Sequence, residues 1–88
     1  MPNEALRDAA ESVREAESFV EAAEKRDQLH AQAEALADLS RRDTSPDETR
    51  LRGHHYTLSE LHGRVNEDAR VHLKDAMERL ENAAEVPF

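Results

Sequence analysis

The stretch Asp43-Thr44-Ser45-Pro46-Asp47-Glu48, near the midpoint of this 88-residue chain, decides the fold. Helix-favouring sequence rich in Ala and Leu lies on both sides of it. Ser45 suits an N-cap with Pro46 at the first helical position, and Glu48, three residues after Ser45, completes a capping box. We therefore predict a central turn at residues 43–47 and a helix that begins at residue 46.

Before this turn, apolar residues recur at helical spacing on two successive faces. Val20 and Leu29 are nine residues apart, about half a turn of helical rotation, so the apolar face changes side between them. Because no Gly or Pro occurs between residues 3 and 45, the sequence favours one unbroken helix over about 4–41, with Asn3 as its N-cap. The alternative is a break near Lys25-Arg26, with Asp27 as the N-cap of a second helix. The two faces comprise Leu6, Ala9, Ala10, Val13, Ala16 and Val20, and then Leu29, Ala33, Leu36, Ala37, Leu39 and Ser40.

After the turn, two further helices are predicted, over about 46–62 and 66–85. Gly63 suits a helix C-cap and Asn66 suits the N-cap of the last helix. The pattern predicts an all-α fold with a single domain over residues 1–88, in which one long helix packs on two shorter ones as a small antiparallel bundle or hairpin. Four short helices account for the same pattern. Their apolar faces comprise Leu51, Leu58, Leu61 and Val65, and then Ala69, Leu73, Ala76, Met77, Leu80, Ala83 and Ala84.

The charge balance excludes several partners. Twenty acidic residues against twelve Lys and Arg give a formal charge of −8, which repels nucleic acid and anionic membranes, so we expect neither as a partner. Abundant carboxylates, ten Arg against two Lys, and abundant Ala are typical of proteins adapted to molar salt, although a GC-rich mesophile also favours Ala and Arg. No apolar run reaches the length of a membrane span or of a signal peptide, so we expect a cytoplasmic protein.

The supply of core residues is small. Apart from Met1, the chain has 18 larger apolar residues and no Cys or Trp, so disulfides and thiolate zinc sites are excluded. A core of this size stabilises a small bundle with little surplus. This shortage favours a homo-oligomer, and the expected partner is a second copy of the chain, as a homodimer, or another protein.

Three histidines share an apolar helical face with leucines in the third segment. His54, His55 and His62 lie on one side of the helix with Leu51, Leu58 and Leu61. No His has another His three or four residues away, so a metal site would need ligands from a second helix. The leading interpretation is that His54 is a half-buried, hydrogen-bonded histidine whose pKa is lowered by burial. The alternative is a metal- or ligand-binding site on the His54, His55 and His62 face.

No motif in the sequence specifies a chemistry, so we expect a non-enzymatic protein without a cofactor. The leading hypothesis for function is a small helical module for protein interaction or self-association, in a halophile. Its candidate contact residues are Phe19, Val20, Leu51 and Leu58.

The sequence also resembles a group of short, acidic, all-helical haloarchaeal proteins of unknown function. The likeness lies in the opening helix Glu4-Ala-Leu-Arg-Asp-Ala-Ala-Glu-Ser-Val, in Gln32-Ala-Glu-Ala-Leu-Ala-Asp-Leu, and in Arg50-Leu51-x-x-His54-x-x-x-Leu58. The resemblance implies a halophilic source and an all-helical fold. It implies no catalytic or binding residue.

Overall fold

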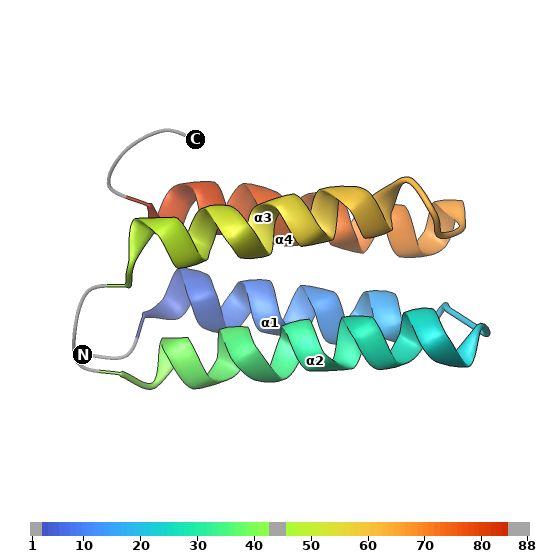
Figure 1. Ribbon diagram of the computed structural model, residues 1–88, viewed down its shortest axis with the longest axis horizontal. Helices are drawn as coiled ribbons and strands as arrows, with labels where there is room; N and C mark the ends of the chain where they lie inside the picture. Colours follow the sequence, from blue (N-terminus) through green and yellow to red (C-terminus); the bar gives the residue numbers. More distant parts are fainter. Residues whose placement is uncertain (1–2, 43–45, 85–88) are drawn as a thin grey trace.

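The computed structural model describes residues 3–42 and 46–84, and the regular structure in these ranges is entirely helical. The four helices are α1 (Glu4–Glu17), α2 (Ala23–Ser40), α3 (Glu48–His62) and α4 (Glu67–Ala83). They lie side by side along the long axis, and each runs opposite to the helix before it (Figure 1). The α1–α2 pair stacks on the α3–α4 pair, so α1 lies against α4 and α2 faces α3.

The prediction of one unbroken helix over 4–41 is wrong. After Glu17 the chain turns through residues 18–22, where the Ser18 hydroxyl donates to the Glu15 carbonyl at 2.6 Å. Lys25, Arg26 and Asp27, the proposed alternative break, lie inside α2. The change of apolar face explains the turn: an unbroken helix would point the second face away from the core, whereas the turn lets α2 fold back so that both faces are buried together. Across residues 3–42 and 46–84 the structure contains four short helices, the alternative prediction.

The start of α3 also differs from the prediction. Pro46 precedes the helix, Asp47 is its N-cap, and the Asp47 Oδ1 accepts a hydrogen bond from the Thr49 amide at 2.9 Å. Asp is as good an N-cap as Ser, so the helix begins at Glu48 instead of residue 46. Ser45 and most of the predicted turn lie outside the described residues.

The other predicted helix ends are confirmed. The Asn3 Oδ1 accepts from the Leu6 amide at 3.1 Å, and the Asn66 Oδ1 accepts from the Ala69 amide at 2.9 Å. Gly63 is the C-cap of α3, which ends at His62 as predicted. α4 ends at Ala83, close to the predicted limit.

The core closes within one chain. Its Cα radius of gyration is 12.0 Å, which matches the roughly 12 Å expected for a compact domain of this length. None of the described helices has the length and apolar character needed to cross a bilayer. The buried apolar residues are those of the predicted faces: Leu6, Ala9, Ala10, Val13, Ala16, Val20, Leu29, Ala33, Leu36, Ala37, Leu39, Leu51, Leu58, Leu61, Val65, Ala69, Leu73, Ala76 and Leu80.

The four helix–helix seams are not equally packed. α1 packs closely along both α2 and α4, α3 packs on α4, and α2 makes the fewest contacts with α3. The α1–α4 seam also carries a polar network, in which the Ser12 hydroxyl donates to Asp75 at 2.5 Å and Arg79 bonds Asp75 at 3.0 Å and Asp8 at 3.3 Å. The hydrogen bond from Ser12, followed by that from Arg79, lowers the pKa of Asp75. The α2–α3 seam is therefore the place where the bundle leaves space.

Candidate functional site

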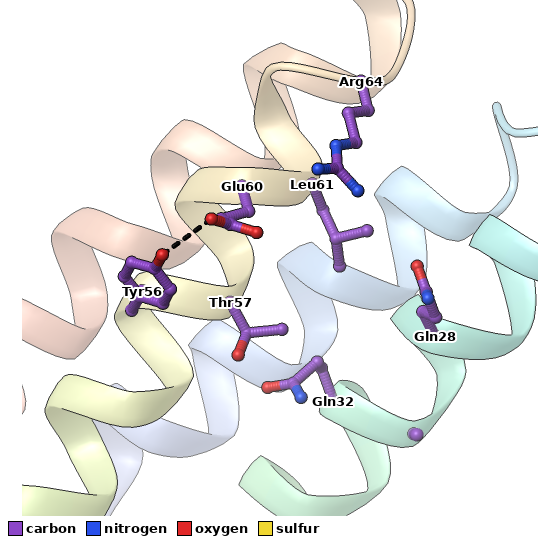
Figure 2. A pocket seen from close by; sticks show the side chains of 8 residues that line it. Gln28, Gln32, Tyr56, Thr57, Glu60, Leu61 and Arg64 are labelled. Atoms are coloured by element: carbon purple, nitrogen blue, oxygen red, sulfur yellow. Dashed lines mark hydrogen bonds between the residues drawn. The ribbon is translucent and has the colours of Figure 1, made fainter.

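A groove of about 270 Å³ lies between α2 and α3 (Figure 2). Residues of α2 supply two side-chain amides and the methyl group of an alanine. Residues of α3 and of the turn after it supply a tyrosine ring, a threonine hydroxyl, a leucine, a carboxylate and a guanidinium. The backbones of α2 and α3 hold seven of these side chains at fixed positions along the groove, and Arg64 enters from the turn after α3. The lining residues are Gln28, Ala31, Gln32, Tyr56, Thr57, Glu60, Leu61 and Arg64.

Tyr56 and Glu60 form a hydrogen-bonded pair at the rim of the groove. They stand one helical turn apart on α3, and the Tyr56 hydroxyl donates to the Glu60 Oε1 at 2.7 Å (Figure 2). This hydrogen bond, together with the charge of Glu60, raises the pKa of Tyr56. Tyr56 is 63% exposed, which makes it one of the most exposed large apolar side chains of the described residues. The pair fixes an aromatic ring in solvent beside the groove.

Arg64 reaches into the groove from the turn between α3 and α4 (Figure 2). The same side chain lines two neighbouring hollows, one towards the turn before α2 and one beside Tyr56 and Gly63. Within residues 3–42 and 46–84, its guanidinium has no ion pair or hydrogen bond, whereas Arg79 pairs with Asp8 and Asp75. Among the described residues, Arg64 is therefore a cation directed into the groove that forms no ion pair, although the Glu60 carboxylate lines the same groove.

His54 links the two walls of this seam. Its Nδ1 lies 2.7 Å from the Gln32 Oε1, and burial, followed by the charge of Arg50, lowers the pKa of the ring. A neutral imidazole donates from one nitrogen, and an amide oxygen only accepts, so the ring carries its hydrogen on Nδ1. The prediction of a half-buried, hydrogen-bonded histidine with a lowered pKa is confirmed.

The other two histidines of the proposed site do not join His54. The His55 Nε2 lies 3.7 Å from the Glu81 Oε1, so this ring faces α4. At His62 it is the backbone carbonyl, not the ring, that accepts from the Arg70 Nε, at 3.0 Å. Among the described residues, no three His, Asp or Glu side chains converge in a way that could hold a metal ion. The structure does not bring the proposed ligand set together.

Comparison with known proteins places the chain in a family without an assigned role. A model of a family of unknown function, DUF7553, matches residues 1–85. The chain belongs to this family. No curated protein and no solved structure matches the sequence. Membership of DUF7553 agrees with the resemblance to an uncharacterised group of proteins, and it assigns no chemistry to the groove.

In this DUF7553 chain, three of the four predicted contact residues are core residues. Leu51 and Leu58 are fully buried and Val20 is 7% exposed, so their contacts are made within the chain. These residues follow the same helical periodicity as the rest of the core. The sequence alone therefore could not show whether they pack inside the chain or contact a partner. Phe19 is 44% exposed, and its ring stacks on His72 with 5.4 Å between ring centroids. Of the four predicted contact residues, which all lie within the described ranges, Phe19 is the one with an exposed side chain.

Sequence reasoning missed the groove residues Gln28, Gln32, Tyr56 and Arg64. Each of them is polar or lies on the polar side of its own helix, which is the ordinary position of a solvated side chain. The available signal was that Tyr56, Glu60 and Arg64 recur at four-residue spacing beside the apolar face of α3. The groove itself depends on how α2 lies relative to α3, and no spacing within one helix reveals that.

Proposed function

We propose that this protein is a small, non-enzymatic helical interaction module, and that the α2–α3 groove binds a segment of another protein. The observation that carries the proposal is the contrast between the seams of the bundle. The other three seams are more closely packed, while the α2–α3 seam makes the fewest helix contacts and holds an open groove with the exposed ring of Tyr56 at its rim. Exposed aromatic side chains beside a groove are typical of residues that anchor protein partners.

The chemistry of the groove supports binding over catalysis. Amides, a hydroxyl and small apolar groups orient a ligand, but they do not abstract a proton or attack a bond without an activated neighbour. The Tyr56 hydroxyl is held by Glu60, and its raised pKa keeps it protonated at neutral pH. Thr57 donates its hydroxyl to the Gly53 carbonyl at 3.0 Å. Glu60 accepts the Tyr56 hydroxyl but raises its pKa, which disfavours a tyrosinate nucleophile, and the Thr57 hydroxyl donates to a backbone carbonyl.

A second candidate, self-association, is favoured by the exposed ring of Phe19. It receives less support than a different partner, because the core is complete within one chain and does not need a second subunit. Two copies that each carry a charge of −8 also repel one another at low ionic strength. At about 1 M salt the Debye length falls to roughly 3 Å, and this repulsion is then screened.

We also infer that the protein works in the cytoplasm of a halophilic archaeon. The support is the distribution of its acidic residues. Within the described ranges, no Asp or Glu residue is classed as buried, and most of their side chains are exposed to solvent. Such a surface holds water and cations in strong salt, and self-repulsion among the carboxylates costs little there.

The proposal is tested by photo-crosslinking in cells of the source organism. A benzophenone amino acid replaces Tyr56 in one variant and Val71, which lies on α4 and is 67% exposed, in the control variant. Because the two positions are similarly exposed, they sample random collisions equally. We expect a discrete crosslinked partner from position 56 that is absent from position 71. Identical products at both positions would contradict the proposal. A crosslink through position 56 between two copies of the chain would show that the partner is a second copy and not another protein.

A further inference from the structure

The charge of the groove differs from that of the rest of the molecule. Residues 48–64, which form α3 and the turn after it, contain Arg50, Arg52 and Arg64 against Glu48 and Glu60, in a chain with a net charge of −8. The α2 wall contributes the uncharged side chains of Gln28, Ala31 and Gln32 to the groove. A carboxylate that enters the groove meets one guanidinium and amide donors, while the Glu60 carboxylate that also lines the groove accepts the Tyr56 hydroxyl.

The Tyr56–Glu60 hydrogen bond explains why Arg64 lacks a partner. Glu60 precedes Arg64 by four residues, the spacing at which Glu and Arg normally pair on a helix. Its Oε1 instead accepts the Tyr56 hydroxyl at 2.7 Å, on the side away from the guanidinium (Figure 2). Arg64 lies in the turn after His62, where the helical geometry has ended. The guanidinium is consequently directed towards Leu61 and the groove (Figure 2).

We propose that Arg64 is the recognition residue of the groove, and that the partner segment it binds carries a carboxylate side chain flanked by apolar residues. This inference rests on the proposed function and names the chemistry of its partner. The guanidinium and the carboxylate form a charge-assisted pair, and the Gln28 amide lies at the same end of the groove as a further donor (Figure 2). Ala31 and Leu61 provide apolar contact for the flanking residues.

The size and openness of the groove favour a polypeptide segment as the occupant. At about 270 Å³ it is slightly smaller than the cavities of roughly 300–1,000 Å³ that enclose small ligands, and it is partly open to solvent. It adjoins the two other hollows lined by Arg64, which extend the surface along α3 and past the turn towards Lys25. An extended surface centred on one cation suits a chain that passes over it, with one acidic side chain at the centre.

The experiment is a selection of random peptides displayed on phage, with the folded full-length chain as the target. Peptides are first depleted on an Ala31→Trp variant, in which an indole fills the groove from an exposed helical position. This step removes peptides that bind the acidic surface elsewhere. The survivors are then resynthesised with each Asp or Glu changed to the matching amide. Affinities are measured for the wild-type chain, for Arg64→Gln, and for Arg52→Gln, an exposed α3 arginine outside the groove lining.

We expect the survivors to be enriched in Asp or Glu beside apolar residues. A hydrogen bond between charged groups contributes enough to change affinity by about tenfold or more, so the amide twins and Arg64→Gln should each lose at least that much. Arg52→Gln should bind as the wild type does. Tyr56→Phe should also weaken binding, because Glu60 is then released to pair with Arg64.

Two results would overturn the inference, and they differ in what they say of the groove. Survivors without acidic enrichment, whose affinity is unchanged by Arg64→Gln, would show that the groove binds peptides without carboxylate recognition. That result rejects the inference and leaves the interaction function standing. A selection that yields no peptide dependent on an open groove would reject both.

Discussion

The hydrogen bond between His54 and Gln32 offers a direct test of how α2 is held against α3. It joins Nδ1 to Oε1 at 2.7 Å in a half-buried position, on the seam with the fewest helix contacts. A neutral hydrogen bond of this kind contributes about 1 kcal/mol to the free energy of unfolding. A double-mutant cycle of His54→Ala and Gln32→Ala isolates that term from the packing lost in each single variant.

The expected coupling energy is about 1 kcal/mol at a pH near 8, which corresponds to roughly 4–8 °C in Tm for a domain of this size. The pKa of His54 in the folded state is lowered from 6.5 by burial and by Arg50. A group whose folded pKa lies below its unfolded value contributes stability above the unfolded pKa, and this stability is lost as the pH falls through the folded pKa. The wild type should therefore lose stability below pH 6.5, and His54→Ala should lose less over the same range.

Urea unfolding at constant ionic strength, at pH values near 8 and near 5, measures the four free energies of the cycle. An NMR titration of the His54 ring gives its pKa independently. Coupling near zero at the higher pH would show that the bond does not stabilise the seam. A folded-state pKa of His54 above 6.5 would refute the reasoning about burial.

Three further predictions address the core, the caps and the charge. Leu73→Ala, at a fully buried position on α4, should destabilise the fold by about 2–5 kcal/mol, while Val71→Ala, at an exposed position on the same helix, should change it by less than about 0.5 kcal/mol in chemical denaturation. Asn66→Ala removes the N-cap of α4 and the hydrogen bond from the Asn66 side chain to the Phe19 carbonyl. The free energy of unfolding should fall by about 0.5–2 kcal/mol, and an unchanged Tm would exclude a role for this cap. Light scattering with circular dichroism should show a folded monomer in about 2 M KCl. In about 0.1 M KCl the chain should partly unfold, because its charge of −8 is less screened there. Full helicity at both salt concentrations would contradict salt adaptation.

Much of this fold could be predicted from the sequence because its signals are local. Asn3, Gly63 and Asn66 mark helix ends through the conformational preferences of single residues, and the structure places a cap at each of them. The apolar faces were likewise predictable, since burial in a small bundle follows the helical period. Their buried members are those that the spacing indicates.

The features that escaped prediction depend on contacts between helices. The turn at residues 18–22 contains no Gly or Pro, and the N-cap of α2, Ala22, makes no side-chain capping bond. That turn exists because α1 and α2 bury their apolar faces against the same core. The conformational preferences of single residues do not predict it. The lack of an ion pair at Arg64 has a similar origin. Glu60 stands four residues from both Tyr56 and Arg64, and only the folded structure shows that it bonds Tyr56.

We propose that the α2–α3 groove is the surface through which this protein binds its partner. The most direct measurement is the affinity of the partner crosslinked at Tyr56 for the wild-type chain and for the Ala31→Trp variant, by isothermal titration calorimetry, with Tm as the check on folding. Filling the groove should weaken binding by about tenfold or more while Tm is retained, because the occupant and the indole compete for the same space. Equal affinity for both chains would contradict it.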